Sequence, residues 1–179
     1  MFKLENGICY FDEVGSTNDE AKRLAEAGAK AGTCVVAFAQ TKGRGRNGRK
    51  WYSAKDEGLY FSIIIKPQEA PKDLTTYVRR AALTTVKAIN ESMGIEMAIE
   101  WPNDLILDER KVGGLLLESV TRGKKVSFLI LGLGLNLNQE KFPPDLQNAA
   151  ISFWQKTGQK YEIKQVAQVI KEAMQSEFS

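Results

Sequence analysis

The sequence predicts an α+β protein in which a mixed, mostly antiparallel sheet is backed by helices. Two observations favour this class: closely spaced strand patterns follow the longest helical pattern, and a second amphipathic helical pattern ends the chain. The resulting order is strand, helix, strands, helix, meander and helices. At 179 residues the chain can bury one core and is too short for two full-sized domains, so we expect one domain over residues 1–179.

The first expected elements are a strand, a helix and a second strand. Apolar residues predict a short strand at residues 8–12. The following residues are of helix-starting types, and Thr17 and Glu20 have the spacing of a capping box, so a helix is expected over residues 16–29. The apolar run at residues 33–39 then predicts a buried strand.

The middle of the chain holds a loop, a strand and the longest helix. Residues 41–50 are rich in Gly and Arg and show neither strand nor helix periodicity, which predicts a loop. Residues 59–65 form an apolar run typical of a strand. Residues 74–93 carry apolar side chains at helical spacing, and Gly94 marks the end of that helix.

The remaining part of the chain predicts a meander followed by helices. Strands are expected at residues 97–101, 105–107, 112–120 and 126–137. A turn at residues 122–123 joins the last two strands, so they should be antiparallel neighbours. A short helical patch is expected at residues 151–156, and an amphipathic helix at residues 163–178.

The composition limits the chemistry that the protein can perform. An apolar fraction of 43%, a charged fraction of 26% and a net charge of +3 are typical of an ordinary globular protein. The chain has no histidine, which excludes catalysis by imidazole and metal sites that need a His ligand. Arg, Lys and backbone amides remain available, and these groups suit phosphoryl and nucleotidyl transfer.

The cysteines and the start of the chain favour a cytoplasmic protein. Cys9 and Cys34 lie in apolar runs and form no Cys-x-x-Cys motif, as expected for buried thiols in a reducing compartment. Residues 1–10 lack the apolar core of a signal peptide, and no stretch approaches the ~20 apolar residues of a membrane span. We therefore expect no membrane partner.

The densest cluster of positive charge coincides with the Gly/Arg loop, residues 43–51. Glycines let backbone amides approach a ligand closely, and guanidinium groups match phosphate and carboxylate oxygens. This composition indicates an anion site. A flexible basic turn or an RNA-binding arginine patch would have the same composition, although no aromatic residues alternate with the cations as base-stacking platforms would.

Three further motifs carry polar groups beside turns or glycines. The turn at residues 101–104 places Asn103 and Asp104 where they could meet a magnesium-bound phosphate or a ribose, or simply make a turn. Lys111 precedes two glycines that leave room for a ligand, although a solvent-facing hairpin lysine would look similar. Residues 132–138 alternate glycines and asparagines with leucines, which suits a planar group lying on the sheet or a bulged core strand.

Together these motifs resemble the catalytic domain of a biotin–protein ligase, a family within the biotin/lipoate ligase superfamily. The matching residues, in the expected order, are Ser16-Thr17-Asn18, the Gly/Arg loop, Trp101-Pro102-Asn103-Asp104 with Lys111-Val112-Gly113-Gly114, and Gly132-Leu133-Gly134-Leu135-Asn136-Leu137-Asn138. The resemblance covers nearly the whole chain, from about Phe11 onward. It implies a fold like that of class II aminoacyl-tRNA synthetases and biotin synthetase.

The resemblance also implies the reaction. Biotin would be activated by ATP with Mg²⁺ to biotinyl-5′-AMP, and biotin would then pass to a lysine of a biotin carboxyl carrier protein. Lipoate-type ligases share the fold and the adenylation chemistry, but the Gly/Arg loop and the Lys-Val-Gly-Gly motif favour biotin. A non-catalytic, biotin-binding degenerate ligase is the alternative from another functional class.

The resemblance assigns three groups of site residues. The catalytic residues would be Arg46, which steadies the adenylate and pyrophosphate, Lys111, which meets the biotin carboxylate and the α-phosphate, and Asp104, a candidate for magnesium or for the incoming lysine. The biotin pocket would be formed by Ser16, Thr17, Gln40, Gly43, Arg44, Lys111, Gly113 and Gly114. The nucleotide side would be formed by Arg46, Arg49, Trp51, Asn103 and Asn136.

The chain departs from the family pattern in one residue and in length. Glu100 stands where the family usually has a lysine, so a carboxylate replaces a cation that would face the nucleotide. Compared with longer family members, we expect no N-terminal helix-turn-helix and no C-terminal barrel-like domain, and hence no binding to DNA. A homodimer is a candidate assembly. Exposed edge strands of the sheet could pair in such a dimer, but the sequence does not show which strands these are.

Overall fold

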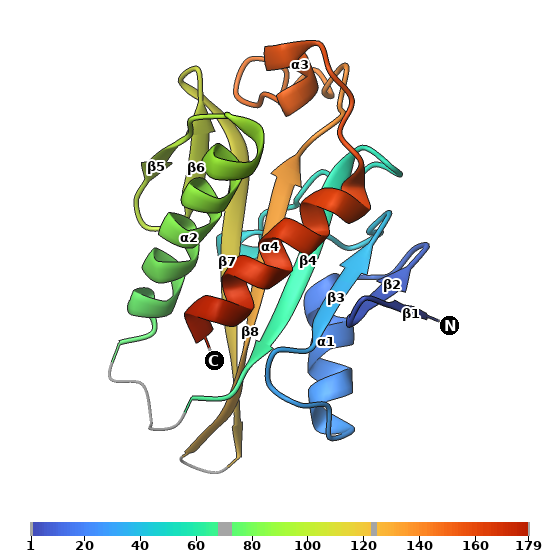
Figure 1. Cartoon of the computed structure of the whole chain (residues 1–179), viewed down its shortest axis with the longest axis vertical. Coiled ribbons are helices and arrows are strands. Elements are labelled where there is room, and N and C mark those ends of the chain that lie inside the picture. The colour runs from blue at the N-terminus through green and yellow to red at the C-terminus, as the bar shows by residue number, and fades with distance from the viewer. Residues whose placement is uncertain (1, 68–72, 123–124, 179) are drawn as a thin grey trace.

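A single sheet organises the molecule. The computed structural model describes residues 2–67, 73–122 and 125–178. Within these ranges the strands are β1 (Lys3–Glu5), β2 (Ile8–Phe11), β3 (Cys34–Ala37), β4 (Gly58–Ile65), β5 (Ala98–Glu100), β6 (Asp104–Leu107), β7 (Arg110–Arg122) and β8 (Lys125–Asn136). They form one sheet in the order β1-β2-β3-β4-β8-β7-β6-β5 (Figure 1). Neighbouring strands are antiparallel except β2 and β3, which confirms the predicted mixed, mostly antiparallel sheet.

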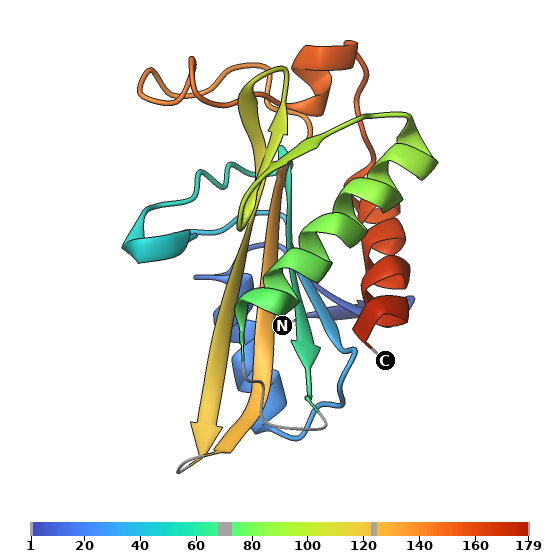
Figure 2. The same cartoon turned by 90° about the vertical axis from the view of Figure 1, so that its left-hand side faces the viewer.

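Helices cover both faces of this sheet. They are α1 (Thr17–Glu26), α2 (Thr75–Met93), α3 (Phe153–Thr157) and α4 (Ile163–Phe178). The long helices α2 and α4 pack against each other and on one face, whereas α1 packs on β3, β4 and β8 from the other face (Figure 2). None of the helices in the described ranges combines the length and apolar composition that crossing a bilayer requires.

The strand alternation divides the core between these two faces. Successive side chains of a strand point to opposite faces. On β4, Phe61 and Ile63 therefore pack with α2 and α4 in the larger apolar cluster, whereas Ile64 packs on the α1 side with Ile130 of β8. The larger cluster thus packs beneath α2 and α4, and the smaller one packs beneath α1 on the opposite face.

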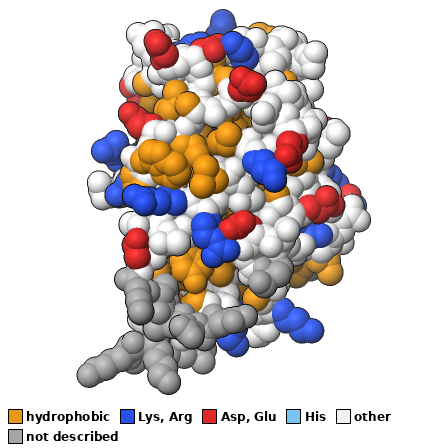
Figure 3. Space-filling model, turned by 60° about the vertical axis from the view of Figure 1, so that its left-hand side comes forward, with side chains coloured by type: hydrophobic (Ala, Val, Ile, Leu, Met, Phe, Trp, Pro, Cys, Tyr) orange, Lys and Arg blue, Asp and Glu red, His pale blue; other side chains and the backbone are white. Residues whose placement is uncertain are grey.

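The surface on the α2 and β5 side is not uniformly polar. Figure 3 shows apolar side chains there in patches that Lys, Arg, Asp and Glu side chains interrupt. Of the described residues, Leu83 on α2 and Trp101 after β5 are among the large apolar side chains that are more than half exposed, at 55% and 51%. Trp101 is accompanied by Arg79, whose guanidinium carbon lies 5.8 Å from the centre of the indole ring.

The predicted capping box at the start of α1 is wrong. Ser16 is the N-cap and makes no side-chain capping bond. The amide of Thr17 donates to Gln40 Oε1 at 2.8 Å, and the Glu20 carboxylate accepts from Arg23 Nε at 2.9 Å. Both members of the expected box are thus engaged elsewhere. The acceptor for the Thr17 amide is a glutamine from a distant loop and not the Glu20 carboxylate.

Other differences concern boundaries. Helix α1 ends at Glu26 and not at Ala29, and β7 is longer than expected because it pairs with β8 over most of its length. Strand β1 was not predicted, since three residues show too little alternation to be recognised. The predicted turn at residues 122–123 extends beyond the described residues.

Candidate active site

A cleft of about 460 Å³ lies on the face of the sheet that carries α1. Its floor is formed where β7, β8 and β4 are paired, with Gly114, Gly134 and Tyr60 in one row across the sheet. The start of α1 borders one side, the Gly/Arg loop crosses over it, and residues 142–150 border one end. Segments far apart in the sequence thus surround one concave space.

Two glycines of β8 make room for the side chains that line this floor. A Cβ at Gly132 would collide with the amide of Asn18, and a Cβ at Gly134 would lie 2.5 Å from the indole ring of Trp51. Any larger residue would therefore push Asn18 or Trp51 off the sheet. The glycine spacing that suggested a planar group on the sheet has a structural cause, since it admits an amide and an indole of the protein itself.

A chain of hydrogen bonds links the sheet to the base of the loop. Ser62 Oγ on β4 lies 2.8 Å from Thr17 Oγ1, and the backbone amide of Thr17 donates to Gln40 Oε1. Gln40 Nε2 donates to Ser53 Oγ at 3.0 Å, and Ser53 Oγ donates to the carbonyl of Trp51 at 3.2 Å. Ser62 and Thr17 are buried and the other members of the chain are half-buried, so the polar end of the cleft is held in one arrangement before a ligand arrives.

The Gly/Arg loop folds back on itself as a short hairpin. The amide of Trp51 donates to the carbonyl of Gly43, and the amide of Gly45 donates to the carbonyl of Arg49 at 2.7 Å. A 3₁₀ turn over Arg46–Gly48 forms the tip, where Asn47 has a φ of 57°. Asparagine tolerates this left-handed conformation better than most residues do. The tip thus has defined structure, although the sequence predicted only an irregular loop.

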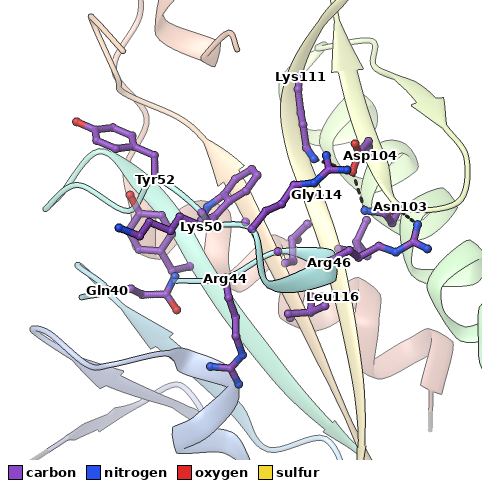
Figure 4. A pocket seen from close by; sticks show the side chains of 18 of the residues that line it. Gln40, Arg44, Arg46, Lys50, Tyr52, Asn103, Asp104, Lys111, Gly114 and Leu116 are labelled. Atoms are coloured by element: carbon purple, nitrogen blue, oxygen red, sulfur yellow. Dashed lines mark hydrogen bonds and ion pairs between the residues drawn. The ribbon is translucent and has the colours of Figure 1, made fainter. Parts of the chain in front are cut away.

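Arg44 points away from the rest of the cations of the site (Figure 4). Its guanidinium forms two bonds to Asp19 of α1, at 2.6 and 2.9 Å, and contacts Glu118 of β7 at 3.1 Å. The bonds to Asp19 raise the pKa of Arg44 further and lower the pKa of the Asp19 carboxyl. The positive charge of Arg44 is therefore matched by carboxylates, and this side chain anchors the loop.

Arg46 of the loop and Lys111 of β7 are connected by polar groups. Arg46 Nη1 donates to Asn103 Oδ1 at 2.7 Å, Asn103 Nδ2 donates to Asp104 Oδ1 at 2.6 Å, and Asp104 Oδ1 lies 2.7 Å from Lys111 Nζ (Figure 4). Lys111 Nζ also lies 5.6 Å from the centre of the Trp51 ring. The loop tip is thereby joined to the turn between β5 and β6, directly over the cleft.

The other end of the cleft is more apolar. It is lined by Trp51, Tyr52, Phe142, Leu146, Ala149 and Ala150. Lys111 exchanges backbone bonds with Ala149 and Ile151, and Asn136 Nδ2 donates to the carbonyl of Ile151 at 3.1 Å, so this end is tied to β7 and β8. Trp51 Nε1 is buried against Gly134 and has no hydrogen-bond partner among the described residues.

Most of the residues that the sequence singled out meet in this cleft. Its lining includes Ser16, Thr17, Gln40, Arg44, Arg46, Arg49, Trp51, Asn103, Asp104, Lys111, Gly114 and Asn136. Gly43 and Gly113 lie just behind it: a Cβ at Gly43 would meet Ser53 Oγ at 2.5 Å, and one at Gly113 would meet Leu135 Cδ2 at 2.6 Å. Glu100 is exposed on β5 and does not belong to the lining.

Several further residues of this cleft had no site role assigned from the sequence. Asn18, Leu116, Gly132 and Tyr60 line it as well. The available signals were the position of Asn18 next to Thr17 and the two-residue spacing of the β8 glycines, which places them on one face of a strand. Tyr60 and Leu116 lie within apolar runs, where sequence alone does not separate a core residue from a lining residue.

Comparison with known proteins agrees with this architecture. The model of the biotin/lipoate A/B protein ligase family matches residues 10–136. The bifunctional ligase/repressor BirA of Bacillus subtilis (strain 168) is 36% identical over 165 residues, which cover 91% of this chain and 51% of that protein. The chain spans about half the length of the curated relatives that it matches first.

Solved structures are similar over nearly the whole chain. The biotin protein ligase from Aquifex aeolicus in complex with biotin and ATP aligns with a TM-score of 0.84 and 33% identity, covering 97% of this chain and 71% of that chain. The biotin protein ligase from Leishmania major in complex with biotinyl-5-AMP aligns with a TM-score of 0.76 and 28% identity, covering 95% and 74%. The fold, the ordered motifs and the family match agree: the chain belongs to the biotin/lipoate A/B protein ligase family.

Proposed function

We propose that the chain is the catalytic domain of a biotin–protein ligase. It activates biotin with ATP to biotinyl-5′-AMP and transfers biotin to a lysine of a biotin carboxyl carrier protein. The main observation in favour is that one cleft joins a rigid polar end to the cations Arg46 and Lys111. The similar structures that contain biotin and ATP, or biotinyl-5-AMP, support the same assignment.

The polar end of the cleft is the proposed biotin pocket. A cyclic urea needs both donors and acceptors at fixed positions, and Ser16, Thr17 and Gln40 provide hydroxyl and amide groups there. Leu116 on the floor offers an apolar surface for the ring and chain of biotin. Gly114, beside Lys111, allows the ligand to lie close to the backbone of β7.

The first step joins the biotin carboxylate to the nucleotide. A carboxylate oxygen attacks the α-phosphorus, the bond to the bridging oxygen breaks, and pyrophosphate leaves with the electron pair. Lys111 and Arg46 compensate the charge that increases on the phosphates, and the loss of one such contact typically costs about 2.7–4 kcal/mol in the transition state. None of these steps needs a histidine, in agreement with the composition.

The second step requires the acceptor lysine to lose a proton. Its amine attacks the acyl carbon, an amide forms, and AMP leaves with the electron pair. Asp104 is the acidic side chain that lines the cleft in the described ranges, so the role of proton acceptor falls to it. The bond from Lys111 holds one of its oxygens, Oδ1, in place.

Magnesium is expected to enter with ATP. No group of three or more Asp, Glu, Cys or His side chains in the described ranges could hold a metal ion by itself. This fits Mg²⁺, which is usually bound through one or two carboxylates together with substrate phosphates. Asp104 is the proposed protein ligand, and the ion would neutralise phosphate charge during adenylation.

The nucleotide side is proposed at the apolar end. Trp51 offers its ring face, Asn136 also lines the cleft, and Arg49 is exposed on the loop that borders it. Because both cysteines are unpaired and buried, and because the reaction uses ATP, we place the protein in the cytoplasm.

The proposal is tested by incubating the protein with biotin, ATP and Mg²⁺, and measuring pyrophosphate and then biotin transfer to a carrier domain. We expect biotin-dependent pyrophosphate release and labelling of one lysine. Lys111→Met should abolish both, and lipoate in place of biotin should give neither product. Binding of biotin without pyrophosphate would instead support a non-catalytic binding protein, and activity with lipoate alone would support a lipoate-type ligase.

A further inference from the structure

Glu118 of β7 joins three separate elements beside the proposed site. Its Oε1 accepts from Arg44 Nε at 3.2 Å and from Arg44 Nη2 at 3.1 Å, and its Oε2 accepts from Asn18 Nδ2 at 2.7 Å. Arg44 belongs to the Gly/Arg loop and Asn18 to α1. One carboxylate therefore connects the loop, the helix start and the sheet.

Glu118 itself is not among the residues that line the cleft. Alternation along β7 places it on the same face as Gly114 and Leu116, one row farther along the sheet, where it lies opposite Ile130 of β8. The side chain is 36% exposed, and that of Arg44 is 31% exposed. Any effect on a ligand must therefore pass through the groups that Glu118 holds.

The first group that Glu118 holds, the guanidinium of Arg44, lies at the base of the loop. Arg44 follows Gly43, whose carbonyl accepts the amide of Trp51, and pairs across the hairpin with Lys50. Fixing the guanidinium of Arg44 therefore fixes the start of both strands of the hairpin. Arg46, which reaches Asn103 across the cleft, is only two residues away.

The second group that Glu118 holds, the side-chain amide of Asn18, lies in the floor of the cleft. The amide oxygen of Asn18 lies 2.6 Å from Ser62 Oγ, and its nitrogen donates to Glu118. Asn18 is 4% exposed and fits only because position 132 is a glycine. Glu118 thus satisfies a buried amide that would otherwise lack an acceptor.

An isolated, exposed ion pair would contribute little to structure. This cluster differs because Arg44 is shared between two carboxylates, with bidentate bonding to Asp19, and because the network includes a buried amide. Both carboxylates hold the same guanidinium from different elements. We infer that Glu118 is a positioning residue, which acts through Arg44 and Asn18 to hold the Gly/Arg loop over the cleft.

This inference has one consequence that does not depend on the reaction. The loop region contains several trypsin sites, at Lys42, Arg44, Arg46, Arg49 and Lys50. In Glu118→Gln, which keeps the shape of the side chain but removes its charge, we expect cleavage within this segment to be about three- to fivefold faster, as for loss of an ion pair of about 1 kcal/mol. The matched control is Glu96→Gln, an exposed carboxylate that makes none of the ion pairs found in the described ranges.

A double-mutant cycle tests the path through Arg44. In an Arg44→Gln background the loop is already released from both carboxylates, so adding Glu118→Gln should change the cleavage rate little further. Independent, multiplying effects of the two substitutions would overturn the inference. So would an unchanged cleavage rate in Glu118→Gln, or faster cleavage spread evenly over the chain with a lower midpoint of urea unfolding.

A second consequence rests on the proposed function. Because the loop and Asn18 border the biotin pocket, Glu118→Gln should raise KM for biotin about fivefold in pyrophosphate exchange while kcat changes by less than about twofold. Glu118→Asp, which keeps the charge, should recover part of this effect. If the wild-type protein forms no adenylate, the proposed function fails, and loop cleavage still decides the role of Glu118. If the wild type is active and KM is unchanged, the inference fails alone.

Discussion

The indole ring of Trp51 lies directly on the backbone of Gly134, with no space for a methyl group between them. This contact joins the Gly/Arg loop to the strand that forms the floor of the cleft. It also fixes the ring beneath Lys111, whose Nζ lies 5.6 Å from the ring centre. The position of the proposed nucleotide platform therefore depends on one missing side chain.

Gly134→Ala should displace Trp51 while leaving the sheet intact. Because inserting a methyl group into a packed contact costs about 1–3 kcal/mol, we expect KM for ATP to rise about tenfold, with a smaller change for biotin. Steady-state pyrophosphate exchange measures both constants. The control is Gly15→Ala, where nothing lies within 4 Å of the added carbon. Equal ATP affinity in both variants would show that the ring position is unimportant.

Arg46→Gly should retain the fold but release biotinyl-5′-AMP early. Arg46 is exposed, and its bond to Asn103 joins the loop tip to the far side of the cleft. Loss of a charge-assisted contact should speed dissociation of the adenylate by about ten- to a hundredfold. Rapid filtration of a radiolabelled adenylate complex measures this rate. Lys55→Gly, in an exposed part of the following turn, serves as the control, and unchanged retention in Arg46→Gly would contradict the assigned role.

The adjacent glycines of β7 should respond differently to alanine. A Cβ at Gly113 would meet Leu135 Cδ2 at 2.6 Å and the carbonyl of Gly134 at 2.9 Å, both inside the core. Gly113→Ala should therefore lower the free energy of unfolding by about 1–3 kcal/mol. A Cβ at Gly114 would meet the flexible end of Lys111 at 3.3 Å, so Gly114→Ala should instead slow adenylation with little loss of stability. Urea unfolding and exchange kinetics separate these outcomes.

Tyr10 should make the protein less stable at alkaline pH. Burial, assisted by the negative charge of Glu5, raises the pKa of Tyr10 to about 12 from an ordinary value of 10.0. The folded state holds this proton more tightly than the unfolded state. The corresponding stability is therefore complete below pH 10 and is lost as the pH rises from about 10 to 12. Urea unfolding over this range should show a shallower decline in Tyr10→Phe, and parallel curves for the two proteins would exclude the effect.

The sequence predicted the fold class from local patterns, and most of the residues that it singled out lie together in one cleft. Alternating apolar residues identified β4, β7 and β8, and the glycines and cations of the loop indicated an anion site. The site residues on α1, the loop and β7 could be assigned together only through a resemblance to a family. Composition alone left the loop equally compatible with a basic turn.

Those local patterns could not identify contacts between residues that are far apart in the sequence. Asn18 and Glu118 are separated by 100 positions, and Arg44 meets Glu118 from 74 positions away. Nothing local to Arg44 distinguishes a guanidinium that anchors a loop from one that binds a phosphate, since both occur beside glycines. The capping box failed for the same reason, because Gln40 competes for the amide of Thr17 only once the chain has folded.

The alternation of the strands separates two kinds of evolutionary change. Even-numbered positions such as Tyr60, Leu116 and Gly134 line the cleft, whereas the side chains of odd-numbered neighbours such as Phe61, Leu115 and Leu133 belong to the core cluster beneath α2 and α4. Substitutions at the even-numbered positions could therefore change which acyl group an evolved protein accepts, without weakening the core that the odd-numbered positions form. Insertion of a single residue in β8 would exchange the two sets, so the register of that strand is harder to change than any one side chain on it.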